Sequence, residues 1–312
     1  MDRVIVFAER VLPSTQTYIP SQVEHLRNFA AVYAGLTPAD KNFELGQAPI
    51  LLRSDRSVVS KVARELYRWL GVGSEYHAQL QRVGARLIHA HFAEGGPAAL
   101  SLSKQLNLPL ILHLHGGAEL MTDANLRRKW YEWTFLAHRH SLWKRASAFL
   151  CVSEYVQRRA AEAGFPSGKT YVHRIGLNCA AFTPKMPVAD KNPGLVLYVG
   201  RLIPYKGCDY LIRAMQLVQL ECPGSRLVII GDGVSRRDLQ DLVRSLDIKC
   251  DFLGELKPAV AFLAGKSPGI VRTERRAAGW AERSLRHCPP RSTGYGCAGG
   301  ELSPWRYPGG HA

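Results

Sequence analysis

The sequence predicts an α/β protein built from two doubly wound, Rossmann-like domains, the second of them incomplete. Apolar strand-like runs alternate with stretches of helical periodicity in both halves of the 312-residue chain. Glycines stand directly after two of the strongest strand-like runs, at Gly200 and Gly231. Parallel sheets bind ligands at the carboxyl ends of their strands, so these glycines are expected at a binding edge.

The C-terminal half shows the alternation most clearly. The expected order is strand, helix, strand, helix, strand, at residues 196–200, 208–218, 226–231, 235–246 and 250–254. Expected in the N-terminal half are strands at 3–7, 86–92, 109–116 and 148–153, with helices at 20–29, 95–106 and 154–163. The expected division is a first domain at 1–188, a partial second domain at 189–256 and an aberrant, disordered tail at 257–312.

A phosphate site is indicated where the strand beginning at Val196 ends. Gly200 and Arg201 follow the strand, and Lys206 and Gly207 close the next loop. Glycine lets a ligand oxygen approach the backbone, while a guanidinium and an ammonium a short loop apart can clamp a diphosphate. Taken alone, these residues are equally compatible with a strand followed by a solvated basic loop.

Two further motifs favour the phosphate site. The sequence Gly231-Asp232-Gly233 follows the second strand of this half, and Phe252-Leu253-Gly254 ends the third. Together with the glycines and cations above, these motifs resemble the donor-binding domain of family 4 glycosyltransferases in order and spacing. The resemblance implies the two-domain GT-B fold, retaining sugar transfer from a nucleotide sugar, and a donor-diphosphate site formed by Gly200, Arg201 and Lys206.

Candidate residues in the first domain come from the same resemblance. His115, which precedes Gly116 at a strand end, is expected to face the donor sugar as the catalytic residue, although a purely structural histidine there remains an alternative. His91 and Glu119 are the expected cleft residues. Family members usually carry an acid shortly after the His-Gly pair; here Ala118 takes the commonest place and Glu119 the next.

Histidines also raise the question of a metal. His89 and His91 are two residues apart on an expected strand, so their side chains share a face, as metal ligands or as a packed pair. The sequence offers no third ligand, so no metal is expected. No cofactor is expected either, because Arg201 and Lys206 can neutralise a leaving diphosphate.

The strong positive charge raises the question of nucleic acid. The net charge is +15 and the isoelectric point about 9.7, and clustered cations bind phosphate backbones. The densest basic region, Arg127 to Arg145, is however rich in tryptophan and reads as a helix. Such a helix can lie on an anionic membrane, or pack on its own domain with its charges in solvent. Nucleic acid is therefore not expected as a partner.

Cellular location is inferred from what the chain lacks. No run of about 18 apolar residues is present, and the start reads as a strand rather than a signal peptide. The seven cysteines show no paired metal spacing, and an odd number suits a reducing compartment. The expected location is the cytoplasm, with peripheral contact at the inner face of the membrane through Arg127 to Arg145.

The C-terminal tail does not match the pattern of the family that the rest of the chain resembles. From about Lys257 the chain becomes rich in Arg, Gly and Pro, where family members continue with strands, helices and two glutamates that hold the donor. Glu274 and Glu282 have the family's spacing, but the residues between them lack the expected apolar helix start, so the match is taken as coincidence.

The genetic code suggests an explanation for the tail. Shifting the reading frame by one nucleotide from Lys266 permits the peptide Glu-Ala-Phe-Gly-Ile-Val-Leu-Leu-Glu-Ala, which resembles the missing family motif. Trp280 and Trp305 would both become glycine, where the family has or tolerates it. The hypothesis is a frameshift between about Gly254 and Lys266.

The resulting functional hypothesis is a retaining glycosyltransferase of cell-surface polysaccharide synthesis, inactive as written. It would move a sugar from a nucleotide-sugar donor to a saccharide or lipid-linked acceptor. The alternative is a non-catalytic truncated remnant or binding module. A nicotinamide dehydrogenase is disfavoured, because no Gly-x-Gly-x-x-Gly follows the first strand.

Overall fold

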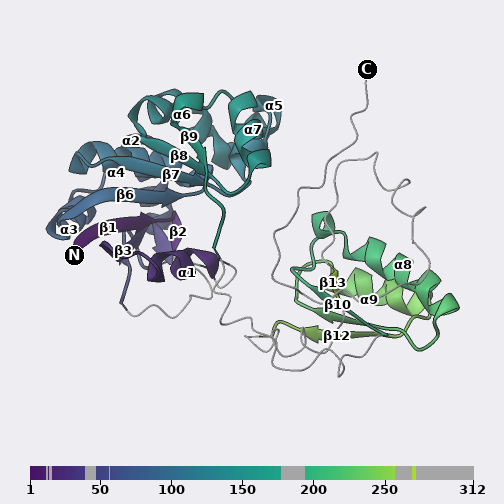
Figure 1. Ribbon diagram of the computed structural model, residues 1–312. Helices are drawn as coiled ribbons and strands as arrows, with labels where there is room; N and C mark the ends of the chain where they lie inside the picture. The colour runs from purple at the N-terminus through teal and green to yellow at the C-terminus, as the bar shows by residue number, and fades with distance from the viewer. Residues whose placement is uncertain are drawn as a thin grey trace, which may run out of the picture. The chain divides into compact units, whose positions relative to one another are not determined.

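The computed structural model describes residues 1–271 except 12, 14, 15, 39–46, 56, 177–193 and 257–268. The chain forms two compact units, Met1–Asn178 and Cys179–Ala312, which are shown in Figure 1. The expected domain boundary at 188/189 and nearly all of the expected tail lie outside the described residues.

The first unit is built on a parallel sheet of seven strands in the order β5-β3-β1-β6-β7-β8-β9. Its strands are β1 (Asp2–Phe7), β3 (Phe29–Gly35), β5 (Ile50–Leu51), β6 (Ala85–His91), β7 (Leu110–Leu114), β8 (Ala148–Cys151) and β9 (Thr170–Val172). A small parallel pair, β2 (Arg10–Val11) and β4 (Thr37–Pro38), lies beside it. The order places β1 and β6 at the centre, so their carboxyl ends lie side by side.

Helices cover both faces of this sheet. They are α1 (Tyr18–Glu24), α2 (Val58–Leu70), α3 (Ser74–Arg82), α4 (Gly96–Leu106), α5 (Asp123–Arg127), α6 (Trp133–Arg145) and α7 (Glu154–Glu162). Alternate side chains of β1 supply two cores: Ile5 and Phe7 join the larger one, while Val4 and Val6 pack with Ile19 of α1 on the other face. This alternation is the period of two that a strand imposes.

Two expected helices differ from the structure. The expected helix at 20–29 ends at Glu24, and Phe29 already begins β3, whose residues Phe29–Gly35 pair with β1. Burial of Tyr33 against β1 and α1 outweighs the local helical pattern. The stretch Arg127 to Arg145 is not one helix either: α5 ends at Arg127, a 3-10 turn spans Trp130–Glu132, and α6 begins at Trp133.

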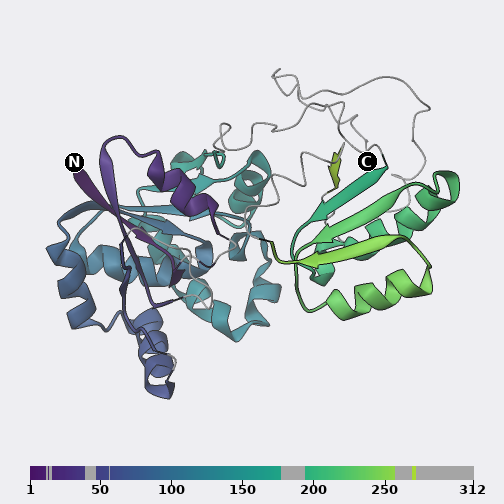
Figure 2. The ribbon, with the colours of Figure 1, turned by 90° about the horizontal axis from the view of Figure 1, so that it is seen from below.

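The second unit contains a parallel sheet in the order β12-β11-β10-β13. Its elements are β10 (Leu195–Val199), α8 (Cys208–Glu221), β11 (Arg226–Ile230), α9 (Arg236–Ser245), β12 (Cys250–Gly254) and β13 (Gly269–Val271). Both helices pack on one face, where Tyr198, Ile212 and Leu239 share a core. Figure 2 shows both helices beside the strands of this sheet.

The strand-helix alternation was expected to stop at about Lys257. Instead β13, which lies inside the expected tail, pairs with β10 in parallel through Leu197 and Ile270. Within the described residues the opposite face of this sheet carries a small core of Leu197, Val228 and Ile230, with Leu256 packed against it. The second domain is thus Rossmann-like, with both of its described helices on a single face.

Candidate functional site

The expected phosphate loop begins where β10 ends in the second unit. The backbone N–H of Gly200 donates to the carbonyl of Ile230 at 3.0 Å, and that of Leu202 donates to the carbonyl of Asp232 at 2.9 Å. These bonds continue the pairing of β10 with β11 beyond the sheet. Arg201, between the two bonded residues, is therefore carried on a rigid backbone while its side chain remains exposed.

The loop brings Arg201 and Lys206 into contact with the same side chain, that of Tyr205. Arg201 donates from Nη2 to the hydroxyl of Tyr205 at 2.9 Å. The Lys206 ammonium lies 5.3 Å from the centroid of the same ring, within the range of a cation–π contact. The structure thus brings both predicted cations together, and it adds Tyr205, which the sequence analysis did not single out.

A helix begins directly after the two cations. Gly207 has φ of +64° and precedes α8, a helix of 14 residues. Glycine adopts this left-handed conformation without the strain that a Cβ brings. The N-terminus of a helix carries a partial positive charge that favours anions. Gly200, Arg201, Lys206 and the start of α8 are thus placed together, in an arrangement whose charge is suited to an anion.

In the first unit, the two expected histidines lie in contact. His91 Nδ1 is 3.0 Å from His115 Nε2, although His91 ends β6 and His115 follows the end of β7. The ring of His115 also packs against Tyr18, with centroids 5.1 Å apart, and against Phe92 at 4.7 Å. His91 is only 1% exposed, so it acts as the buried neighbour of the half-buried His115.

Two further histidines complete a four-membered group that we call the histidine cluster: His89, His91, His113 and His115. No third ligand was expected beside His89 and His91, but in the structure His113 lies next to them, because it pairs in register with His91. The signal was present in the sequence: His113 and His115 are also two apart on an expected strand. Sequence alone did not reveal that β6 and β7 are neighbours.

Burial governs the charge of the histidine cluster. It lowers the pKa of His89 to about 3, that of His113 to about 4 and that of His115 to about 3. The pKa of His91 is also well below its usual value, first through burial and then through the neighbouring imidazoles. All four rings are therefore neutral at neutral pH.

Glu119 lies beneath the loop that follows His115. Its side chain accepts a hydrogen bond from the backbone N–H of Gly116 at 2.7 Å and is 1% exposed. Glu94, which the sequence analysis missed, accepts from the N–H of Ala118 at 3.1 Å. Two buried carboxylates thus hold the loop by its backbone, and Glu119 is turned inward rather than toward solvent.

The two carboxylates have raised pKa values. Burial, followed by the charge of Glu94, raises the pKa of Glu119 to about 7. Burial also raises the pKa of Glu94. The charge of Glu94 thus adds to burial in disfavouring ionisation of Glu119.

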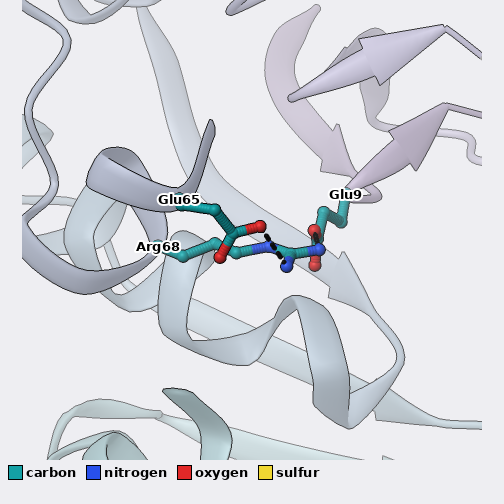
Figure 3. A network of polar contacts seen from close by, with 3 residues as sticks. All are labelled: Glu9, Glu65 and Arg68. Atoms are coloured by element: carbon teal, nitrogen blue, oxygen red, sulfur yellow. Dashed lines mark hydrogen bonds and ion pairs between the residues drawn. The ribbon is translucent and has the colours of Figure 1, made fainter. Parts of the chain in front are cut away.

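A hollow lies where β1 and β6 end. It is lined by Ala8, Glu9, Arg10, Gln16, Thr37, Arg64, Arg68, His91, Phe92, Glu94 and Gly95. Figure 3 shows how Arg68 of α2 points toward Glu9 and Glu65, with Nη1 2.9 Å from Glu65 Oε1 and an ion pair to Glu9 through Nη2. The lining contains three arginines and two glutamates, so the hollow at the carboxyl edge of the sheet has a net positive charge.

Exposed aromatics mark the basic stretch 127–145. Trp130 is 64% exposed, Tyr131 45% and Trp133 51%, beside Arg127, Arg128 and Lys129.

Among the described residues, no helix has both the length and the apolar character needed to span a membrane.

Comparison with known proteins identifies the family. Residues 25–180, half of the chain, match the model for Glycosyltransferase Family 4, and residues 182–266 match that for Glycosyl transferases group 1. The architecture defined above is that of two-domain α/β proteins with parallel sheets. The chain belongs to glycosyltransferase family 4.

Curated relatives match parts of the chain. Alpha-D-kanosaminyltransferase of Streptomyces kanamyceticus is 29% identical over 188 residues, covering 52% of this chain and 46% of the relative. The putative colanic acid biosynthesis glycosyltransferase WcaL of Escherichia coli is 26% identical over 164 residues, covering 51% and 38%. The chain thus spans about half the length, or less, of these relatives.

Solved structures confirm the fold. Anabaena Alr3699/HepE in complex with UDP and glucose has a TM-score of 0.65 at 16% identity, covering 88% of this chain and 74% of that one. The apo form of the lipopolysaccharide outer core galactosyltransferase WaaB has a TM-score of 0.58 at 16% identity, covering 87% and 74%. The expected GT-B fold with two Rossmann-like domains is confirmed.

Proposed function

We propose that the protein is a retaining glycosyltransferase of cell-surface polysaccharide synthesis, with a nucleotide sugar as donor. The observation that carries the proposal is the placement of Arg201 and Lys206 around Tyr205, directly before the N-terminus of α8. Two cations and a helix N-terminus suit a diphosphate, which is the leaving group of such donors.

The chemistry of sugar transfer gives a role to Arg201, Lys206 and His115. The acceptor hydroxyl oxygen forms a bond to the anomeric carbon while the bond from that carbon to the diphosphate breaks, and the hydroxyl proton passes to the departing phosphate. Arg201 and Lys206 neutralise the charge that develops on the diphosphate. His115, neutral through burial, offers the sugar hydroxyls a hydrogen bond.

We assign acceptor binding to the hollow at the ends of β1 and β6. Its lining includes Arg10, Arg64 and Arg68, which suits a saccharide that carries a phosphate or carboxylate, including a lipid-linked acceptor. The exposed aromatics of the stretch 127–145 favour contact with the inner face of the membrane, from which such an acceptor would be taken.

Sugar transfer by a chain of unbroken reading frame tests the function. With UDP-glucose as the probe donor and a lipid-linked saccharide fraction as acceptor, His115→Ala should lower turnover at least 100-fold with little change in donor affinity. Donor binding without turnover in the unmutated protein would support the alternative, a non-catalytic binding module. Absence of nucleotide-sugar binding to a panel of donors would contradict both.

We also propose that the reading frame changes between about Gly254 and Lys266. The match to the group 1 family ends at residue 266, while the chain continues for 46 residues to Ala312. The frameshifted tail would make this polypeptide inactive as written. Resequencing the gene across the codons for Gly254 to Lys266 tests the proposal, and a confirmed frame with sugar transfer by this same chain would refute it.

A further inference from the structure

The histidine cluster has a geometry that sugar transfer does not require. His89 and His91 lie on β6, His113 lies on the neighbouring strand β7, and His115 directly follows the end of β7. Residues two apart on a strand share a face, and His91 stands opposite His113 in the register. Four imidazoles are therefore held on one face of a rigid, central part of the sheet.

Three of the rings converge. One nitrogen from each of His89, His91 and His113 lies within 4.8 Å of the others. His89 Nε2 and His113 Nδ1 are 3.3 Å apart. Tetrahedral zinc with Zn–N bonds of 2.0–2.1 Å separates two ligand nitrogens by roughly 3.3–3.4 Å. His89 Nε2 and His113 Nδ1 already have this separation, and the nitrogen of His91 lies within 4.8 Å of both.

Hydrogen bonding within the described residues leaves part of the cluster unexplained. The contacts His89–His113 and His91–His115 use one nitrogen of each ring. His91 Nε2, His113 Nε2 and His115 Nδ1 are buried and have no hydrogen-bond partner in the described part of the chain. Buried polar atoms without partners are rare and costly, and among these three atoms His91 Nε2 is the one that a ligand shared with His89 Nε2 and His113 Nδ1 would satisfy.

The chemistry of the cluster selects the ligand. Imidazole nitrogen suits borderline divalent ions such as zinc, whereas magnesium and calcium require oxygen ligands. Neutral imidazole is the form that binds a metal. We propose that His89, His91 and His113 bind one zinc-class divalent ion, with water in the fourth position.

Such an ion would act on the proposed sugar-contacting residue through a neighbour. His91 contacts His115 through Nδ1, so a metal on the other nitrogen of His91 would fix the proton on Nδ1 and orient His115. Second-shell contacts of this kind determine tautomers at metal sites. The ion would also join β6 to β7.

Metal titration of the full chain, with any affinity tag removed and metal stripped by a chelator, tests the site. Zinc should bind at one ion per chain with a micromolar or lower Kd. His89→Gln and His113→Asn should each weaken binding at least tenfold, while His140→Asn, an exposed histidine of α6, should leave it unchanged. Lack of saturable binding, or equal binding by the ligand variants, would overturn the proposal.

Two measurements on the unmutated protein are independent of variant folding. X-ray absorption of the zinc-loaded protein should show three imidazoles and no sulfur ligand. The cobalt-substituted protein should show ligand-field bands without thiolate charge transfer. A thiolate signal would place the ion on cysteine and refute the site. Because the titration uses no donor, its outcome is separate from that of the proposed transferase function.

Discussion

Gly231 lies so close to the carbonyl group of Gly200 that position 231 has no room for a side chain. A Cβ at position 231 would stand 1.9 Å from the carbonyl oxygen of Gly200, and the φ of Gly231 is +138°. This contact brings the end of β11 against the start of the phosphate loop. The position of Arg201 thus depends on a glycine that is 30 residues away in the sequence.

Replacing Gly231 tests that dependence. Gly231→Ala should destabilise the second unit by at least about 1–3 kcal/mol through backbone strain, and the displaced loop should weaken nucleoside-diphosphate binding. Chemical denaturation and calorimetry measure the two effects. Gly224→Ala is the matched control, because a Cβ there meets nothing within 4 Å. Equal stability of the two variants would show that the contact is not required.

Lys206→Ala should weaken binding of a nucleoside diphosphate by about 1.5–3 kcal/mol, the range for hydrogen bonds to charged groups. The ammonium would otherwise approach the phosphates from beside Tyr205. Calorimetry with UDP as the probe measures the change. Arg213→Ala removes the same charge from an exposed position on α8 and should have little effect. Unchanged affinity in Lys206→Ala would exclude this residue from the site.

Glu119 should make the protein less stable as the pH rises toward neutrality. Its pKa is raised in the folded state, from 4.5 to about 7. The contribution of the protonated Glu119 carboxyl to the unfolding free energy is therefore fully present below about pH 4.5. It is lost as the pH rises through about 7. A shift of this size corresponds to about 3 kcal/mol.

Glu119→Gln separates this effect from the hydrogen bond to Gly116, because the amide oxygen still accepts it. Relative to the unmutated protein, the variant should gain unfolding free energy between pH 5 and pH 8, measured by urea denaturation. Glu75→Gln, at an exposed position of α3, is the matched control for the removal of a surface carboxylate. A difference for Glu119→Gln that does not change with pH would contradict the raised pKa.

The exposed aromatic and basic stretch 127–145 should bind acidic vesicles, with an affinity that falls as salt screens the attraction. Trp130→Ala should reduce binding severalfold because its ring is 64% exposed and can enter the interface. Leu220→Ala, in the second unit and 76% exposed, serves as control. Equal partitioning of the unmutated protein onto neutral and acidic vesicles would refute membrane contact.

Local pattern was sufficient for much of the second unit. The strands Arg226–Ile230 and Cys250–Gly254 lie where the sequence predicts them. Each strand there is a short apolar run that ends at a glycine, and each helix has a clear apolar stripe. The hydrophobic period and the positions of the glycines therefore predict the same elements. The same agreement made Arg201 and Lys206 recognisable as a pair.

Prediction failed where distant strands decide local structure. Phe29 was placed in a helix because its neighbours have helical spacing, but pairing with β1 makes it the first residue of a strand. Helices α2 and α3 were not predicted, although α2 is strongly amphipathic, and Val58, Val59 and Leu70 of α2 are exposed. Burial and pairing override weak local preference.

The sequence by itself determined the fold class, the family resemblance and the two cations of the phosphate loop, because these depend on order and spacing along the chain. The tertiary structure decided which side chains meet. It turned Glu119 inward onto Gly116, and it brought His113 beside His91. Strand order sets such contacts, and strand order is a property of the whole sheet that no local stretch of sequence contains.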